Sequence, residues 1–268
     1  MALTTDLWTY RGLIGNLAQR ELKARYKRSI LGWAWSLINP FTTLVTYAIV
    51  FGTFLKVQPP VAGNGDLKNF ALYLFAALVV WNFWMAVENG SMGSLIGAGP
   101  LLRKVYFPPE CPVVASLLVA LSQTAIETGI LVAIMVIVHN VSWTFVFVPL
   151  IIALLVLFSL GVGLVLSLVN VYYRDVQYLV QVGMNVLFYA TPIVYPLALV
   201  ENNAPAPIAL AVRLNPMTQF VGAMRDAVYN LQAPSAGHLA YLAVVSIGTA
   251  AIGWGLFRRF AGRVSEEL

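Results

Sequence analysis

Long apolar segments alternate with short polar segments along the whole chain. Six segments are apolar and long enough to cross a membrane as helices, and they lie at about 36–57, 70–90, 112–138, 143–171, 177–200 and 238–260. The fourth segment has no ionisable side chain between Trp143 and Val171. Turn-forming stretches such as VQPPVAGNGDL, YFPPECP and ENNAPAPI separate the segments. The pattern predicts an all-α polytopic membrane protein with six transmembrane helices, in which residues 1–268 form a single membrane domain.

The fifth segment is expected to be irregular. From Gln177 its helix can continue to about Ala190, before Pro192 and Pro196 interrupt it. About 14 residues at 1.5 Å each span about 21 Å, which is less than the hydrocarbon core of roughly 30 Å. The chain then stays semi-apolar and interrupted by prolines until the last segment. We therefore expect short re-entrant or gate helices on the outer side, in a region of about 200–237, near something polar.

The basic residues fall mainly on one side of the predicted topology. If the N-terminus is cytoplasmic, the inner segments hold 12 of the 16 Lys and Arg residues, which are Arg11, Arg20, Lys23, Arg25, Lys27, Arg28, Arg103, Lys104, Arg174, Arg258, Arg259 and Arg263. The outer segments hold the other four, which are Lys56, Lys68, Arg213 and Arg225. This asymmetry predicts that both termini face the cytoplasm.

Composition agrees with a membrane protein. Hydrophobic residues make up 60% of the chain and charged residues 10%, against about 25% charged residues in soluble domains. The single cysteine, Cys111, excludes an intrachain disulfide and a cysteine-rich metal site. No convincing cleavable signal is present, because the first apolar segment follows about thirty polar and basic residues.

A basic helix is predicted before the first crossing, within residues 9–32. On a helical wheel Arg20, Lys23 and Lys27 share an arc of roughly 60°, and apolar residues occupy the other side. Glu21 and Arg25 form an i,i+4 pair in the favoured order. The pattern predicts an amphipathic helix at the inner membrane surface. A simple topology anchor would explain the charge but not the length of the helix.

Motifs for catalysis are missing from the sequence. There is no G-x-x-x-x-G-K-[ST] phosphate loop, so this chain alone is not expected to hydrolyse ATP. H-E-x-x-H and G-x-S-x-G are absent as well, and His139 and His238 are the only histidines. We expect a protein that is not an enzyme, that has no catalytic or metal site, and that takes its energy from elsewhere.

Some polar and aromatic residues within the predicted spans are candidates for lining a channel. Glu127 lies in the middle of the third span, so its carboxylate should face the bundle interior or a partner. It either lines a hydrophilic path or, as we favour, hydrogen-bonds to neighbours such as Gln123. Trp81, Phe83 and Trp84 lie deep in the second span. An interfacial aromatic belt is the commoner role for tryptophan, and stacking against sugar rings inside a conduit is the alternative.

Two inner connections between spans carry charge. The stretch GSMGSLIGAGPLLRKVYFPPE is long enough for a short helix with Arg103, Lys104 and Tyr106, and the stretch NVYYRDVQYL contains Arg174 and Asp175. Both are explained by ordinary solvated turns with inside-positive anchors. Two compact elements of this kind would also suit docking to a soluble motor protein.

Four separate stretches carry a family resemblance. RELKARYKRSILGWAWSLINP resembles the N-terminal signature of type-2 ABC transporter permeases that export polysaccharides across bacterial inner membranes, with matches at Arg20, Lys23, Arg25, Tyr26, Lys27, Leu31, Gly32, Trp35 and Pro40. LNPMTQFVGAMRDAVY is similar to the family's segment before the last span, with matches at Asn215, Pro216, Phe220 and Arg225. Met224 stands where an aromatic residue is common in the family. GPLLRKVYFPPE and YYRDVQYL look like its inner loops.

The resemblance implies a half-transporter in the bacterial inner membrane. Two copies of the chain would form the channel as a homodimer, powered by two copies of a separate nucleotide-binding subunit that binds ATP and Mg²⁺. The chain itself would bind no cofactor and no nucleic acid. Substrates of the family are glycans linked to a polyprenyl-pyrophosphate lipid, such as O-antigen, teichoic acid, capsule or cell-wall galactan.

The resemblance also implies roles for particular residues. Residues 101–107 would form a coupling helix for the ATPase, and the turn at Arg174 and Asp175 would make a second contact. Arg25, Lys27 and Arg28 become candidates for binding the lipid pyrophosphate, although membrane anchoring explains the same charges. Asn215, Pro216, Phe220 and Arg225 would belong to gate helices at the outer exit.

Three other functions remain as alternatives. An ABC permease for another lipid or a drug would often lack the basic RYKRSILGWAW stretch. A membrane-embedded glycosyl- or acyltransferase would need a cluster of carboxylates or histidine near one face, whereas Glu88, Glu127 and Asp226 lie on different predicted elements. A passive channel would leave the two charged inner loops without a purpose.

Overall fold

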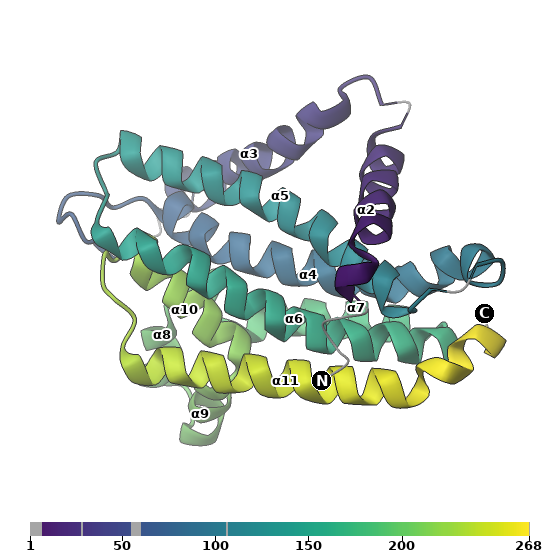
Figure 1. Ribbon diagram of the computed structural model, residues 1–268. Helices are drawn as coiled ribbons and strands as arrows, with labels where there is room; N and C mark the ends of the chain where they lie inside the picture. Colours follow the sequence, from purple (N-terminus) through teal and green to yellow (C-terminus); the bar gives the residue numbers. More distant parts are fainter. Residues whose placement is uncertain (1–6, 28, 55–59, 106, 268) are drawn as a thin grey trace.

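The computed structural model of the protein describes residues 7–27, 29–54, 60–105 and 107–267 (Figure 1). Every regular element in these residues is a helix. Five helical segments are long and apolar enough to cross a membrane, and they are Trp35–Phe54, Phe70–Leu102, Glu110–Ile137, Trp143–Tyr172 and Ala236–Gly262. The prediction of an all-α protein with several membrane-spanning helices is confirmed at this level.

The central helix of the bundle is α4 (Phe70–Leu102), because neighbours cover it on nearly every side. It packs against α5 (Glu110–Ile137) and α6 (Phe147–Tyr172), which follows the short helix η3 (Trp143–Val146). An all-round apolar sequence such as ALYLFAALVVWNFW suits a helix buried on all faces.

The last helix, α11 (Ala236–Glu267), packs very closely on α6. A Cβ atom added at Gly161 would lie 2.3 Å from the carbonyl oxygen of Thr249, and one added at Gly253 would lie 2.1 Å from the carbonyl oxygen of Gly161. Small residues at a helix crossing let two backbones approach each other in this way. The two glycines therefore fix the distance between α6 and α11.

A short helix, α2 (Arg11–Tyr26), lies across one end of the bundle at a steep angle to α4, α5 and α6 (Figure 1). Its apolar residues Ile14, Leu17 and Ala18 pack against Phe107 and the first turns of α5. This contact confirms that one side of the helix is apolar. The helix is shorter than the predicted 9–32, because the chain becomes extended at Lys27.

The chain turns from α2 into the first long helical segment at Gly32. Its φ of 48° lies in the left-handed region, which a residue without a Cβ atom adopts most easily. The short helix η1 (Gly32–Ala34) leads directly into α3 (Trp35–Tyr47), which continues as the π-helical turns of η2 (Ala48–Phe54). The turn follows from the glycine, and the span begins at Trp35.

The predicted fifth crossing, at 177–200, is not one continuous helix. The helix α7 (Val176–Ala190) ends where the prolines predicted, and the chain continues as α8 (Leu197–Asn203), α9 (Ala206–Leu214) and α10 (Pro216–Val228). With 15 residues, α7 is about 22 Å long at 1.5 Å per residue. The break comes from Pro192 and Pro196, which cannot continue a helix.

The bundle has two chemically different ends. We call the end with the 102–110 connection, the 173–175 turn and the last turns of α11 the basic end. Phe257 of α11 packs there against Leu95 and Leu168, and α2 lies at the same end. We call the end that holds α10 the α10 end.

Loops at the α10 end hold α10 in place by binding its last carbonyl groups. The amide nitrogen of Asn140 donates to the carbonyl oxygens of Val228 at 2.9 Å and Tyr229 at 3.1 Å. Thr144 donates its hydroxyl to the carbonyl oxygen of Ala227 at 2.7 Å. The last carbonyl groups of a helix have no partner within the helix, so these side chains satisfy them. The turn after α5 and the helix η3 thus both hold the end of α10.

Candidate functional site

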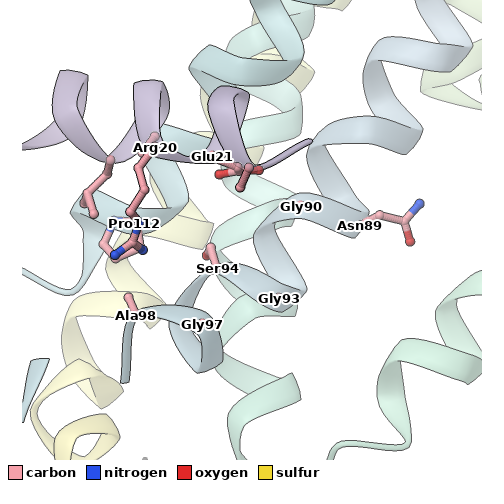
Figure 2. A pocket seen from close by; sticks show the side chains of 12 residues that line it. Arg20, Glu21, Asn89, Gly90, Gly93, Ser94, Gly97, Ala98 and Pro112 are labelled. Atoms are coloured by element: carbon pink, nitrogen blue, oxygen red, sulfur yellow. The ribbon is translucent and has the colours of Figure 1, made fainter. Parts of the chain in front are cut away.

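A cavity of ≈ 370 Å³ lies at the basic end between α2, α4 and α5 (Figure 2). We call it the α2 cavity. Arg20 and Glu21 line it from α2, Gly93 and Gly97 from α4, and Pro112 from the start of α5. Figure 2 shows Arg20 extending from α2 toward Pro112. The cavity is therefore a gap between α2 and the helices of the bundle on which α2 packs, and Arg20 forms part of its wall.

Glycines on α4 keep this cavity open. Gly90, Gly93 and Gly97 recur at helical spacing, which places them on one face of α4. A Cβ atom added at Gly93 or Gly97 would meet nothing within 4 Å. Longer side chains at these positions would project into the cavity, so the size of the cavity depends on the glycines.

Glu21 is the acidic residue of the α2 cavity. Burial raises the pKa of its carboxyl group above 4.5, and the nearby charges of Arg25 and Arg20 offset part of this shift. The ionised carboxylate is thus partly removed from water and relies on two arginines for compensation. An incoming anion would compete with Glu21 for Arg20.

The three predicted pyrophosphate residues lie apart from this cavity. Arg25 and Lys27 are exposed on α2 and at its C-cap, and Arg28 lies outside the described residues. Lys27 instead lines a shallow groove of ≈ 630 Å³ on α2, together with Arg20 and Lys23. The groove confirms that these three cations share one side of the helix. Arg20 is the residue that the groove and the α2 cavity have in common.

The predicted coupling residues come together at the basic end. Arg103 and Lys104 follow α4, Arg174 follows α6, and all three line one cavity of ≈ 410 Å³. Asp175 accepts hydrogen bonds through its carbonyl oxygen from the first turns of α7, at 3.1 and 3.2 Å. Tyr106 lies outside the described residues. Two loops about seventy residues apart in sequence thus form a single basic surface.

The aromatic channel candidates are buried inside the chain in this conformation. Trp81, Phe83 and Trp84 are 5%, 1% and 6% exposed. The rings of Trp81 and Trp84 pack edge to face with centroids 5.1 Å apart, and Trp81 makes a similar contact with Phe188 of α7 at 5.5 Å. They join α4 to α7, and a role in lining a channel stays a prediction.

Glu127 joins α5 to α4 by a hydrogen bond, and its partner Gln123 extends the connection to α3. Asn82 of α4 donates to its Oε2 and Gln123 of α5 donates to its Oε1, both at 3.3 Å. Gln123 also donates to the carbonyl oxygen of Ser36 in α3, at 3.0 Å. This is the helix–helix bonding that the sequence favoured for Glu127, including its partner Gln123.

The predicted gate residues fasten α10 to its surroundings. Asn215 caps α10 by accepting from the backbone of Met217 at 3.0 Å, and it donates to the hydroxyl of Thr191 at 3.1 Å. Pro216 occupies the first turn, where a missing N–H costs nothing. Phe220 is fully buried and packs against Phe158 of α6, with ring centroids 5.7 Å apart.

Arg225 is the most extensively bonded of the predicted gate residues. It is 4% exposed, and its guanidinium donates to the carbonyl oxygens of Tyr73 at 3.2 Å and Pro192 at 2.6 Å, and to that of Ile193. Burial lowers its pKa to about 10, so it stays charged at neutral pH. Arg225 thus ties α10 to the break after α7 and to the first turn of α4.

Comparison with known proteins identifies the type of protein to which these features belong. Residues 13–229 match the family described as ABC-2 type transporter. The chain belongs to this family. It is therefore a transporter membrane subunit and not an enzyme, and the ATPase of an ABC-2 transporter is a separate subunit.

Named relatives of this ABC-2 permease share most of its length. It is 29% identical over 246 residues to the O-antigen export system permease protein RfbA of Myxococcus xanthus, covering 91% of each chain. It is 24% identical over 255 residues to RfbA of Klebsiella pneumoniae, covering 94% and 93% of the two chains. It is also 24% identical over 244 residues to the polysialic acid transport protein KpsM of Escherichia coli, covering 89% and 90%.

Sequence reasoning missed several residues that position parts of this ABC-2 permease. Arg20 was placed on the basic arc, but nothing in the sequence shows that it lines a cavity with glycines of α4. Asn140, in the turn after α5, and Thr144, in η3, bind the last carbonyl groups of α10, and single polar residues give no signal in the sequence of such a partner. Glu88 was not missed, because a carboxylate within an apolar segment is expected to face the bundle interior, and it is fully buried on α4 beside Gly163.

Proposed function

We propose that this ABC-2 permease forms the channel of an ATP-driven exporter, which moves a polyprenyl-pyrophosphate-linked polysaccharide across the bacterial inner membrane. Relatives named as O-antigen export permeases and polysialic acid transport proteins match it over about nine-tenths of their length, which supports this substrate class. The α2 cavity is the observation that carries the proposal. It places a cationic side chain beside an open space at the end of the bundle where a lipid headgroup would lie.

The basic end would be the cytoplasmic side. Most of the Lys and Arg residues lie there, as expected for inner segments. The last turns of α11 lie at this end together with α2, which supports both termini in the cytoplasm. In this arrangement α2 lies along the inner membrane surface, where its cations would meet anionic headgroups.

A sixth crossing would be made by α7 and the residues after it. The chain leaves α6 at the basic end, near Arg174, and Pro192 and Ile193 already accept hydrogen bonds from Arg225 at the α10 end. A helix of about 22 Å followed by extended chain therefore passes from one end of the bundle to the other. Such a broken crossing is tolerated where it is covered by protein or lines a polar path.

The exposed side of α7 supports a homodimer with a channel between two chains. Gln177, Gln181, Asn185 and Tyr189 recur every four residues and are all exposed in the single chain. Residues spaced by four lie on one face of a helix. Amide and phenol groups on a membrane-crossing helix would be costly against lipid, and they suit a conduit for a hydrated sugar polymer.

The partner would be a nucleotide-binding subunit, two copies of which bind ATP and Mg²⁺. Its docking surface would be the cavity lined by Arg103, Lys104 and Arg174. We expect that replacing Arg103 and Lys104 together with alanine lowers the substrate-stimulated ATPase activity of the reconstituted complex. Unchanged stimulation would remove both residues from the coupling role.

The headgroup assignment is tested by lipid binding to the permease–ATPase complex in nanodiscs. With a polyprenyl pyrophosphate as the probe, Arg20→Gln is expected to weaken binding about tenfold, because a charge-assisted hydrogen bond is lost. Glu21→Gln is expected to strengthen it, because the competing carboxylate is removed. Arg213→Gln, on α9 at the α10 end, is the matched control. Equal binding of the uncharged polyprenol would contradict the assignment.

The substrate class is tested in cells. Depleting the permease should cause a lipid-linked glycan to accumulate on the cytoplasmic side, and its composition would separate O-antigen, capsule, teichoic acid and galactan. Accumulation of a small lipid or retention of a drug would favour the alternative ABC permease. Loss of a sugar or acyl modification without accumulation would favour a transferase.

A further inference from the structure

A second polar cavity, of ≈ 270 Å³, lies at the α10 end. We call it the α10 pocket. It is enclosed by α10, the first turn of α4 and the residues just after α7, and it is close in size to the smallest ligand pockets of about 300 Å³. Tyr73, Thr218 and Arg225 form a buried floor, whereas Gln219 and His238 on the rim are partly exposed. The pocket therefore has a buried base and opens to the protein surface.

The floor contains a hydroxyl group that lacks a partner. Thr218 is 3% exposed, and its Oγ1 has no hydrogen-bond partner within the described part of the chain. Buried polar side-chain atoms nearly always have one. Thr218 lines the pocket while its Oγ1 is itself buried, so a ligand hydroxyl would supply the missing bond once a rotation about χ1 turns this oxygen toward the pocket.

The other polar groups of the pocket provide donors and acceptors together. Asp226 accepts from the amide of Asn230 at 2.8 Å, and His238 lies with its Nε2 3.0 Å from the carbonyl oxygen of Gln219. Burial raises the pKa of Asp226, and Asn230, His238 and Arg225 offset part of the shift. Carboxylate, amide, imidazole and hydroxyl groups are thus gathered around one small space.

The charge of Arg225 is not available for an anion. Its guanidinium is already directed at the carbonyl oxygens of Tyr73, Pro192 and Ile193. The carboxylate of Asp226 lines the same pocket and would repel a phosphate or a sulfate. A neutral ligand rich in hydroxyl groups is therefore favoured, because it can donate and accept without bringing charge.

We infer that the α10 pocket binds one neutral sugar unit of the exported glycan as the polymer leaves the permease. This site rests on the proposed function, since the pocket lies at the end of the bundle where the polymer would emerge. Thr218 and Asp226 are the residues that would bind the sugar directly. A sugar held here by each chain would keep the emerging polymer from sliding back between turnovers.

Gly222 offers a way to close the pocket without changing its polar groups. A Cβ atom added there would have its nearest neighbour, Cε1 of His238, at 3.8 Å, which is an ordinary contact. Gly222→Ala is thus expected to fold normally. Gly222→Leu would extend a side chain into the pocket and exclude a sugar.

The test is saturation-transfer difference NMR on the permease–ATPase complex in nanodiscs. The neutral probes are methyl α-D-mannopyranoside and methyl β-D-galactopyranoside, and the anionic probe is glucose 6-phosphate. Thr218→Val and Asp226→Asn are each expected to weaken binding of a neutral probe about tenfold, the effect of losing one good hydrogen bond. Thr46→Val, on the exposed side of α3, is the matched control.

The outcomes separate cleanly. Transfer to a neutral probe that is lost in Gly222→Leu and retained in Gly222→Ala supports the pocket as a sugar site. Absence of transfer to both neutral probes, equal transfer in the two Gly222 variants, or stronger binding of glucose 6-phosphate would overturn it. Melting temperatures of all variants show whether a loss of binding comes from unfolding. If Thr218→Val proves unstable, the comparison of Gly222→Leu with Gly222→Ala still tests the site.

Glycan export by reconstituted vesicles distinguishes this inference from the proposed function. If export is measured but no neutral probe binds at the pocket, the permease function stands and the sugar site fails. If the pocket binds a sugar but no glycan is exported, the site stands and the proposed function fails. If both hold, Gly222→Leu is expected to slow export relative to Gly222→Ala.

Discussion

Arg225 of α10 lies against Tyr73 of α4, although 152 positions separate the two residues in the sequence. Its Cζ is 3.7 Å from the centroid of the tyrosine ring, and its Nε donates to the carbonyl oxygen of the same residue at 3.2 Å. Stacking on an aromatic face and forked donation are properties of a guanidinium that an ammonium lacks. The carbonyl oxygens of Pro192 and Ile193 accept from the other N–H groups, so this one side chain satisfies the backbone carbonyl groups that the break after α7 leaves without helical partners.

We predict that Arg225→Lys destabilises the permease in spite of its retained charge. A single ammonium cannot reach three carbonyl groups, so buried acceptors are left without donors at a cost of about 2 kcal/mol or more. Thermal unfolding in detergent measures the effect, and Arg213→Lys on the exposed surface of α9 is the control. If both substitutions shift the melting temperature equally, the carbonyl contacts of Arg225 do not hold the break together.

A second prediction concerns the close crossing of α6 and α11. Gly161→Ala is expected to lower the free energy of unfolding by at least about 2 kcal/mol, because the new methyl group would lie 2.3 Å from the carbonyl oxygen of Thr249. Gly248→Ala on α11 is the matched control, since a Cβ there meets nothing within 4 Å. The yield of monodisperse protein and its melting temperature are the measurements. Equal stability of the two variants would mean that the helices do not touch at Gly161.

A third prediction concerns pH and Glu21. Burial raises its pKa above 4.5, so the folded protein holds this proton to a higher pH than the unfolded chain does. Stability from this group is therefore greatest below pH 4.5 and falls as pH rises through the raised pKa. We expect Glu21→Gln to melt at a higher temperature than the wild type at pH 7, and this difference to shrink toward pH 4. A difference that grows on acidification would show that Arg20 and Arg25 outweigh burial.

Features fixed by neighbouring residues could be predicted from the sequence. Pro192 and Pro196 place the end of α7 at Ala190, because a proline ring excludes a helical hydrogen bond wherever it occurs. Gly32 likewise places the turn before α3. The interruption expected in the segment at 177–200 is confirmed on this ground, because α7 ends before Pro192 and the next helix begins only at Leu197.

Features that depend on distant parts of the chain could not be predicted. The cavity residue Arg20 belongs to the same basic helix as Arg25 and Lys27, and only the packing of α2 on α5 selects it. Arg103 and Arg174 were assigned to separate loops, and the ends of α4 and α6 bring them to one cavity. Hydrophobic pattern shows which side of a helix is buried, but it does not show which helix covers it.

The last prediction decides the role of Glu127. Its two hydrogen bonds to Asn82 and Gln123 indicate a structural role, so stability should fall from the wild type to Glu127→Gln and further to Glu127→Ala, by about 1 kcal/mol per lost bond. Glycan export per folded complex should stay unchanged in Glu127→Gln. A double-mutant cycle with Asn82→Ala should show coupling between the two residues, measured from their unfolding free energies. An export rate that falls tenfold while stability and coupling stay at wild-type values would mean instead that the carboxylate contacts the transported polymer.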